Sequence, residues 1–167
     1  RQEGRVSDIY FQRTLKILQA KGIEKRVRAE FAVKSFPNGW PWAVLAGVEE
    51  TVDLFRNLPV NVRCMEEGTI FRPFQPVLEI EGDYADFGIY ETAILGYLCQ
   101  ATGIATKGAR CRILAKQVPL IMFGARRIHP TISPMVERNA YIGGCDGVAA
   151  VKSGEIIGLQ ASGTIPH

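Results

Sequence analysis

The stretch PLIMFGARRIHPTISPMVERNAYIGGCDGVAAVKSGEIIGLQASGTIPH, residues 119–167, decides the fold class of this chain. Its apolar run Leu120–Phe123 predicts a short buried strand, and Ser133-Pro134 predicts a helix start, with serine as the N-cap and proline at the first helical position. A second strand is expected over 141–144, a second helix from 147 to 153, and a third strand over 159–164. Strands that alternate with helices at this spacing are parallel, so the segment predicts the opening of an α/β barrel.

The residues before this stretch have the pattern of a mixed α+β domain. A helix is expected over 8–21, because Ser7 or Asp8 can cap its start and Gly22 can end it. Strands are expected over 27–33, 42–46, 60–65 and 77–81, and further helices over 48–57, 86–100 and 103–116. Strands joined by turns and followed by helices suit an α+β domain. We therefore expect an α+β domain at 1–116 and an incomplete barrel at 117–167.

Composition excludes several classes of function. The chain has 167 residues, a hydrophobic fraction of 47% and a net charge of +3, which allow one domain or two small ones. Its basic residues are scattered, whereas a nucleic-acid-binding surface is dense in lysine and arginine. No apolar run approaches the roughly 20 residues that span a membrane. We therefore expect neither nucleic acid nor membrane as a partner, and a small anionic substrate instead.

The cysteines and the chain ends point to a cytoplasmic protein that is longer than this chain. The four cysteines do not have the short spacing of a zinc site, so free thiols are expected. No signal peptide is recognisable, which favours the cytoplasm. The sequence begins without methionine and ends directly after an apolar stretch, so we expect a fragment of a longer protein.

Candidate site residues follow each expected strand of the barrel segment. Phe123, Arg126 and Arg127 follow the first strand, Asp146 follows the second, and His167 follows the third. Active sites of parallel barrels lie at the carboxyl ends of the strands. The sequence therefore predicts that these residues surround one opening.

Each of these residues also has a plain structural interpretation. Phe123 could belong to the core, the two arginines could be a solvated loop pair, and Asp146 before Gly147 could cap a helix. The other histidine, His129, is interpreted as a structural loop residue. Tyr10 could be a half-buried helix residue.

Motifs along the whole chain resemble one enzyme family. The motifs SDIY at 7–10, FGARR at 123–127, GGCDG at 143–147 and SGTIPH at 162–167 resemble successive motifs of the nicotinate and nicotinamide phosphoribosyltransferases. Residues 67–110 also resemble quinolinate phosphoribosyltransferase. Members of this family are much longer, join an α+β domain to an α/β barrel and work as dimers. The resemblance therefore implies a truncated type II phosphoribosyltransferase fold and a homodimer.

The resemblance also implies roles for individual residues. Phe123 would stack on one face of the pyridine ring and the partner subunit's Tyr10 on the other. Arg126 would contact the base and the phosphate region, and Asp146 would lie beside the ring. His167 matches a histidine that is phosphorylated in ATP-coupled members. Aromatic faces hold a flat ring and favour its developing positive charge.

The implied activity is nicotinate phosphoribosyltransfer, which forms nicotinate mononucleotide and pyrophosphate from nicotinate and phosphoribosyl pyrophosphate in NAD biosynthesis. Arg127 and Thr164 complete the expected substrate contacts, since the fork of an arginine suits carboxylate and phosphate. Mg²⁺ is expected as a cofactor and ATP is possible; the RRIHP stretch at 126–130 resembles archaeal-type members, which leaves ATP coupling open. Quinolinate enzymes carry an arginine after the helix glutamate, whereas Glu91 is followed here by Thr92. The alternatives are transfer to nicotinamide or quinolinate, or a non-catalytic binding protein on the same fold.

Overall fold

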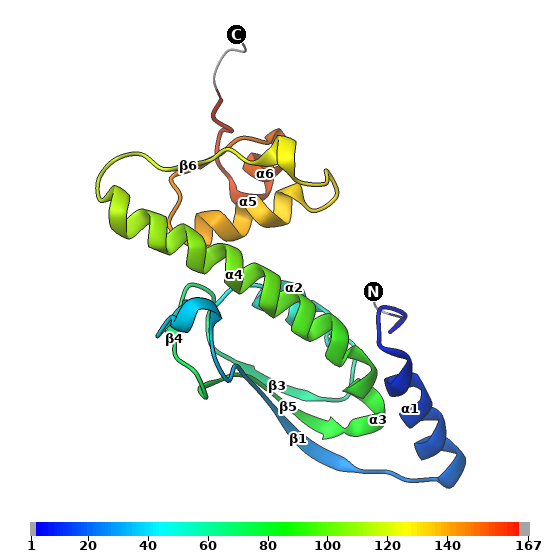
Figure 1. Cartoon of the computed structure of the whole chain (residues 1–167). Helices are drawn as coiled ribbons and strands as arrows, with labels where there is room; N and C mark the ends of the chain where they lie inside the picture. The colour runs from blue at the N-terminus through cyan, green and yellow to red at the C-terminus, as the bar shows by residue number, and fades with distance from the viewer. Residues whose placement is uncertain (1–2, 164–167) are drawn as a thin grey trace.

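One long helix, α4 (Glu91–Ala115), organises the chain. The computed structural model describes residues 3–163. An antiparallel sheet packs beside the N-terminal half of α4, and a parallel strand pair with its helices packs beside the C-terminal half (Figure 1). The two helices expected over 86–100 and 103–116 are therefore wrong. Gly103, where the second helix was expected to begin, lies inside α4, and the helix continues because Ile94, Leu98, Ala101 and Ala105 are buried along it.

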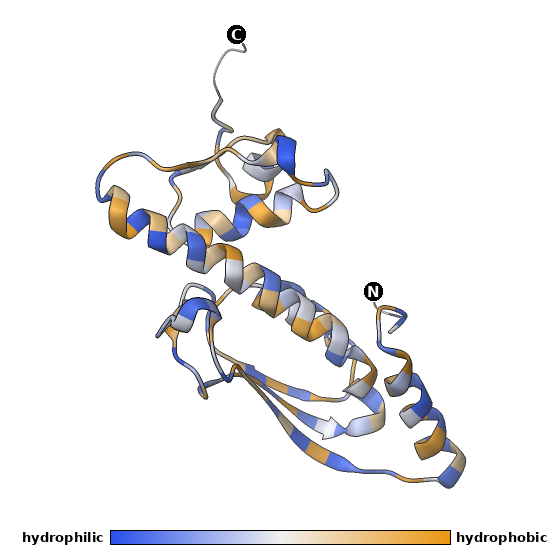
Figure 2. Ribbon diagram, in the orientation of Figure 1, coloured by the Kyte–Doolittle hydropathy of each residue, from blue (hydrophilic) through white to orange (hydrophobic). Residues whose placement is uncertain are grey.

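The N-terminal sheet has the order β1 (Arg26–Ala32), β5 (Pro76–Asp83), β3 (Asn61–Cys64), and all its pairs are antiparallel. These strands confirm those expected over 27–33, 60–65 and 77–81. Hydrophilic and hydrophobic bands alternate along β1 and β5 (Figure 2), because side chains point to opposite faces of a strand. The apolar face of the sheet joins the core cluster that contains Leu78, Ile80 and Ile94.

Short elements complete the N-terminal part. They are α1 (Ile9–Lys21), the 3-10 turn η1 (Pro37–Gly39), β2 (Ala43–Val44), α2 (Val48–Asp53), β4 (Ile70–Phe71), α3 (Tyr84–Phe87) and η2 (Gly88–Tyr90). The ends of α1 confirm the expected helix, since Asp8 is its N-cap residue and Gly22 adopts a left-handed φ of 60° at its C-cap. The Asp8 side chain makes no capping hydrogen bond. It bonds to Thr92 of α4 instead, with 2.9 Å between Thr92 Oγ1 and Asp8 Oδ2.

The C-terminal part is a parallel pair, β6 (Ile121–Met122) and β7 (Gly147–Val148), with α5 (Ser133–Ile142) between them and α6 (Val151–Ile157) after them. β6 confirms the strand expected over Leu120–Phe123, and its pairing with β7 confirms the expected parallel arrangement. The strand expected over 141–144 is wrong, because α5 continues through Ile142. The helix expected from 147 begins only at Val151, and residues 147 and 148 form β7 instead.

Two further expectations for this part fail. Ser133 is not the N-cap of α5; that position is Ile132, and the Ser133 hydroxyl is buried without a hydrogen-bond partner. Residues 159–163, the described part of the expected third strand, form no strand. They nevertheless run beside β7, because the Ser162 amide donates to the carbonyl of Val148 over 2.8 Å.

Glycine brings α5 into direct backbone contact with α4. A Cβ atom on Gly143, which ends α5, would lie 2.2 Å from the carbonyl oxygen of Ala105. A Cβ atom on Gly108 of α4 would lie 3.1 Å from the carbonyl oxygen of Ala140. These contacts set the position of the β6–β7 pair on α4. The expected boundary at residue 116 coincides with the end of α4, but two separate domains stay a prediction.

Candidate functional site

The carboxyl edge of the β6–β7 pair carries the aromatic and basic residues that the sequence singled out. Phe123 directly follows β6, and its side chain is 51% exposed. Arg126 and Arg127 follow in the 3-10 turn η3 (Ala125–Arg127), and both are exposed. Within residues 3–163, the side chain of neither arginine has a hydrogen-bond or ion-pair partner. An open aromatic face beside two unpaired guanidinium groups suits a flat anionic ligand.

Glu137, which no sequence motif indicated, fixes the loop beside this edge. Its side chain is 0% exposed. The carboxylate accepts hydrogen bonds from the amides of Ala149 at 3.3 Å and Ala150 at 3.0 Å, the two residues that follow β7. A buried carboxylate requires such partners. The available signal was an acidic residue beside Val136 and Ala140 on the buried face of α5.

Asp146 lies at the other end of the strand pair. Ile121 is level with Gly147 in the parallel register, so Asp146, which precedes β7, is level with Leu120. Phe123 is three residues further along, or roughly 10 Å at the rise of a strand. The expectation that Asp146 and Phe123 meet at one edge is therefore wrong. It depended on a strand over 141–144, where the structure has the end of α5.

Hydrogen bonds hold Asp146 in this position. Its Oδ2 atom accepts from the Leu120 amide at 2.7 Å and also pairs with the guanidinium of Arg112. The Leu120 amide and the Arg112 guanidinium together keep the pKa of Asp146 below its ordinary value. A direct role of Asp146 beside a pyridine ring stays a prediction.

Tyr10 lies at the start of α1, beside the N-terminal end of α4, and its side chain is 54% exposed. The pKa of the phenol is raised, mainly by desolvation and to a lesser extent by the nearby carboxylates of Glu91 and Asp8. The carboxyl of Glu91 also has a raised pKa, because of burial and then the charge of Asp8. The surroundings of Tyr10 are therefore acidic.

One chain does not bring Tyr10 and Phe123 together. Thr92, which bonds to Asp8, and Arg112, which bonds to Asp146, are 20 residues apart on α4, or roughly 30 Å at the rise of an α-helix. Figure 1 shows α1 and β6 near opposite ends of this helix. A pyridine ring held between these two aromatic side chains must therefore take them from different chains.

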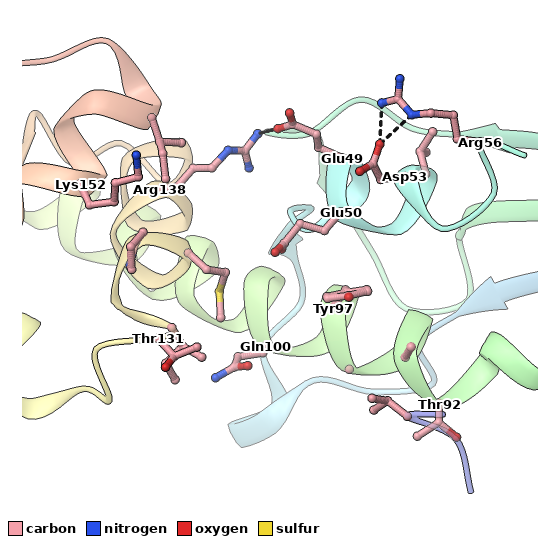
Figure 3. A pocket seen from close by; sticks show the side chains of 18 residues that line it. Glu49, Glu50, Asp53, Arg56, Thr92, Tyr97, Gln100, Thr131, Arg138 and Lys152 are labelled. Atoms are coloured by element: carbon pink, nitrogen blue, oxygen red, sulfur yellow. Dashed lines mark hydrogen bonds and ion pairs between the residues drawn. The ribbon is translucent and has the colours of Figure 1, made fainter. Parts of the chain in front are cut away.

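A large groove separates α2 from α5 and α6. Its volume is about 1040 Å³. Glu49, Glu50 and Asp53 line one wall, and Arg138 and Lys152 line the other (Figure 3).

An ion pair missed by the sequence analysis joins the two parts of the chain beside this groove. Arg138 of α5 donates to Glu67 at 2.7 Å. Glu67 also accepts from the amides of Gly47 and Val48 at 2.7 and 3.0 Å. Burial opposes ionisation of Glu67, but Arg138 and the two amides outweigh it and lower its pKa. Arg138 and Glu67 are 71 residues apart, so no local sequence pattern indicates that they pair.

Two expected site residues, Thr164 and His167, lie outside the described residues. Among residues 3–163, no group of three or more histidine, cysteine, aspartate or glutamate side chains could hold a metal ion. Mg²⁺ usually binds through one or two carboxylates together with substrate phosphates, so the expected Mg²⁺ stays a prediction. No helix within that range is long and apolar enough to cross a membrane.

Comparison with known proteins agrees with this architecture. Residues 8–102 match the family described as quinolinate phosphoribosyl transferase, N-terminal domain. A nicotinate phosphoribosyltransferase 2 from Arabidopsis thaliana is 30% identical over 99% of this chain, which spans 32% of that relative. A nicotinate phosphoribosyltransferase 1 from the same plant is 34% identical over 74% of this chain, which spans 23% of that relative.

Solved structures extend the likeness to the whole chain. The crystal structure of a nicotinate-nucleotide pyrophosphorylase from Pyrococcus furiosus is 56% identical, with a TM-score of 0.96, and covers 99% of this chain and 42% of its own. The human nicotinic acid phosphoribosyltransferase is 22% identical, with a TM-score of 0.87 over 96% of this chain and 39% of its own, which shows the fold alone.

The fold and the comparisons place the protein among the type II phosphoribosyltransferases, as a partial α+β structure from the N-terminal region. The chain belongs to the family of the quinolinate phosphoribosyltransferase N-terminal domain. The expected family and fold class are thereby confirmed. The chain spans about a third or less of the two plant relatives and 42% of the Pyrococcus furiosus protein.

Proposed function

We propose that the protein is a nicotinate phosphoribosyltransferase, in which the carboxyl edge of β6 binds the pyridine base and the phosphates. The observation that carries the proposal is the exposed set of Phe123, Arg126 and Arg127 directly after β6. The names of the relatives support the reaction, since two of them are called nicotinate phosphoribosyltransferases.

The chemistry assigns one task to each side chain. The pyridine nitrogen attacks C1 of the ribose, the C1–O bond to pyrophosphate breaks, and pyrophosphate leaves with the electron pair. The ring nitrogen becomes cationic in this step, which the π-face of Phe123 favours. The arginines donate to the carboxylate and phosphate oxygens and offset the charge that develops on the leaving group. No step is assigned to Mg²⁺ here; a need for Mg²⁺ and coupling to ATP are proposals for separate tests.

Quinolinate is the second candidate substrate, because the matching family is described by that name. The structure gives a reason to favour a pyridine with one acidic group. Thr92 is engaged with Asp8, and the charge of Asp8 also acts on the carboxyl of the neighbouring Glu91. A second substrate carboxylate near Tyr10 would therefore meet acidic groups.

The test is a product assay with the protein at its full natural length. Phosphoribosyl pyrophosphate and Mg²⁺ are supplied with nicotinate, nicotinamide or quinolinate, and the products are separated by chromatography. We expect nicotinate mononucleotide from nicotinate. Quinolinate turnover with release of carbon dioxide, without turnover of nicotinate, would overturn the substrate assignment. Absence of turnover with every pyridine would favour the non-catalytic alternative.

A matched pair of variants tests the edge itself. Arg126→Lys keeps the charge but loses the planar fork, so kcat/KM should fall by about 100-fold, as for the loss of one preorganised donor. Arg63→Lys makes the same change on the outer face of the sheet, where the arginine pairs with Glu79 at 3.7 Å, and should leave kcat/KM unchanged. Equal kcat/KM for the two variants would contradict the assigned edge.

The separation of Tyr10 and Phe123 supports a homodimer that shares its sites. Tyr10→Ala and Phe123→Ala should each be inactive alone. Mixed dimers should regain activity, because one of their two sites contains both intact aromatic residues. No recovery after confirmed subunit exchange would rule out sharing.

A further inference from the structure

Arg112, near the end of α4, uses its guanidinium group to tie three separate segments together. Its Nε donates to the carbonyl of Gly144 at 2.8 Å. Its Nη1 donates to the carbonyls of Lys116 at 2.9 Å and Val118 at 3.0 Å. Its Nη2 pairs with the carboxylate of Asp146. One side chain thereby connects the end of α4, the linker to β6 and the turn before β7.

Asp146 links Arg112 to the strand pair through hydrogen bonds to Leu120. Its carboxylate accepts from the Leu120 amide, and its own amide donates to the Leu120 carbonyl, each at 2.7 Å. These bonds lie at the amino end of the β6–β7 pair, directly before the level of Ile121 and Gly147. They therefore fix the register of two strands that are each only two residues long.

We infer that Arg112 is a positioning residue, which acts through Asp146 on the register of β6 and β7 and so on the placement of Phe123, Arg126 and Arg127. The expected effect on catalysis rests on the proposed function, whereas the expected effect on the register of β6 and β7 does not depend on it. Strands this short have few ladder hydrogen bonds of their own, so side-chain bonds at one end have a large share in their position. A side chain displaced by about 1 Å can cost roughly 100-fold in rate.

Arg110 offers a matched control two residues away on α4. Its guanidinium lies 3.8 Å from the ring centroid of Trp40 and 4.8 Å from that of Trp42. Its Nε and Nη2 atoms are buried without a hydrogen-bond partner. Arg110→Lys therefore removes a planar group from the same helix without removing any bond to the β6–β7 pair.

The first readout is hydrogen exchange, which does not depend on activity. In Arg112→Lys and in Asp146→Asn, the amides of Leu120 and Asp146 should exchange faster, while those of β1 and β5 keep the wild-type rate. Arg110→Lys should leave the amides of Leu120 and Asp146 at the wild-type rate. Unchanged exchange at both amides in Arg112→Lys would overturn the inference, whatever reaction the protein catalyses.

The second readout is a double-mutant cycle on kcat and KM for nicotinate, at a temperature where circular dichroism shows every variant folded. Arg112→Lys should lower kcat/KM by about 10- to 100-fold, and the Arg112→Lys/Asp146→Asn double variant should be no worse than the poorer single variant. Multiplicative losses would show that Asp146 acts on the substrate independently of Arg112, and would overturn the inference. Faster exchange with unchanged kcat and KM would also overturn it, because the bonds would then serve stability alone. Absence of activity in the wild type would count against the proposed function. The exchange result would then decide whether Arg112 fixes the register of β6 and β7.

Discussion

Replacement of Gly143 by alanine tests the close approach of α5 to α4. The added Cβ would lie 2.2 Å from the carbonyl oxygen of Ala105 and 2.9 Å from its carbonyl carbon. Both atoms belong to the backbone of a buried helical turn, so no side-chain rotation can relieve the overlap. The helices α4 and α5 would have to separate by roughly 1 Å to restore van der Waals contact.

The cost can be estimated from these contacts. Overpacking of this kind destabilises a protein by about 1–3 kcal/mol, and a rigid backbone neighbour places Gly143→Ala at the upper end. Alanine is compatible with the backbone here, because Gly143 has φ −71° and ψ −3°. Alanine also lowers the conformational entropy of the unfolded chain, which offsets the loss by about 0.4–1 kcal/mol. We expect a net loss of about 2–2.5 kcal/mol, a large part of the 5–15 kcal/mol typical of a domain.

Urea unfolding followed by circular dichroism measures this loss. Gly103→Ala is the matched control, because that glycine is inside α4 and a Cβ there would meet no atom within 4 Å. It should raise the free energy of unfolding by about 0.5–1 kcal/mol, since alanine is the better helix former. A Gly143→Ala protein within about 0.5 kcal/mol of the wild type, the range of a neutral surface change, would refute the close approach of the two helices.

Three further predictions concern single side chains. Glu67→Gln should destabilise the protein at neutral pH but lose this effect in acid. Because the folded-state pKa of Glu67 is lowered, the stability that its carboxylate contributes is complete above the unfolded pKa of about 4.3 and disappears as pH falls through the folded value. Urea midpoints that differ equally between variant and wild type at pH 7 and at pH 3 would contradict this. Thr106→Val should cost about 1–3 kcal/mol in urea unfolding, because the buried Val44 amide donates to the threonine hydroxyl at 2.9 Å and would lose its acceptor; a neutral result would show that another acceptor replaces it. Cys145, whose thiol pKa burial raises, should react with iodoacetamide more slowly than the exposed Cys99, and equal labelling by mass spectrometry would argue against that burial.

Local sequence signals predicted much of the N-terminal part. The alternation of apolar and polar residues in β1 and β5 determines which face of the sheet is buried, and a glycine at position 22 ends α1. Local reasoning failed where a second helix was expected from Gly103 and where a strand was expected through Gly143. Glycine indicates a break or a close approach equally well, and only the neighbouring helix decides which of the two it is.

The sequence by itself determined the family, the mixed α+β character, the parallel strands and the position of Phe123, Arg126 and Arg127 directly after β6. These features depend on motifs and on periodicities within a few residues. The tertiary structure alone decided that α4 is one helix, that Asp146 lies at the amino end of the strand pair, and that Tyr10 and Phe123 of one chain are far apart. Arg112 and Asp146 are 34 residues apart, and Arg138 and Glu67 are 71 apart. Such bonds form only after packing has brought distant segments together, because residue types alone do not specify which buried or half-buried charges will meet.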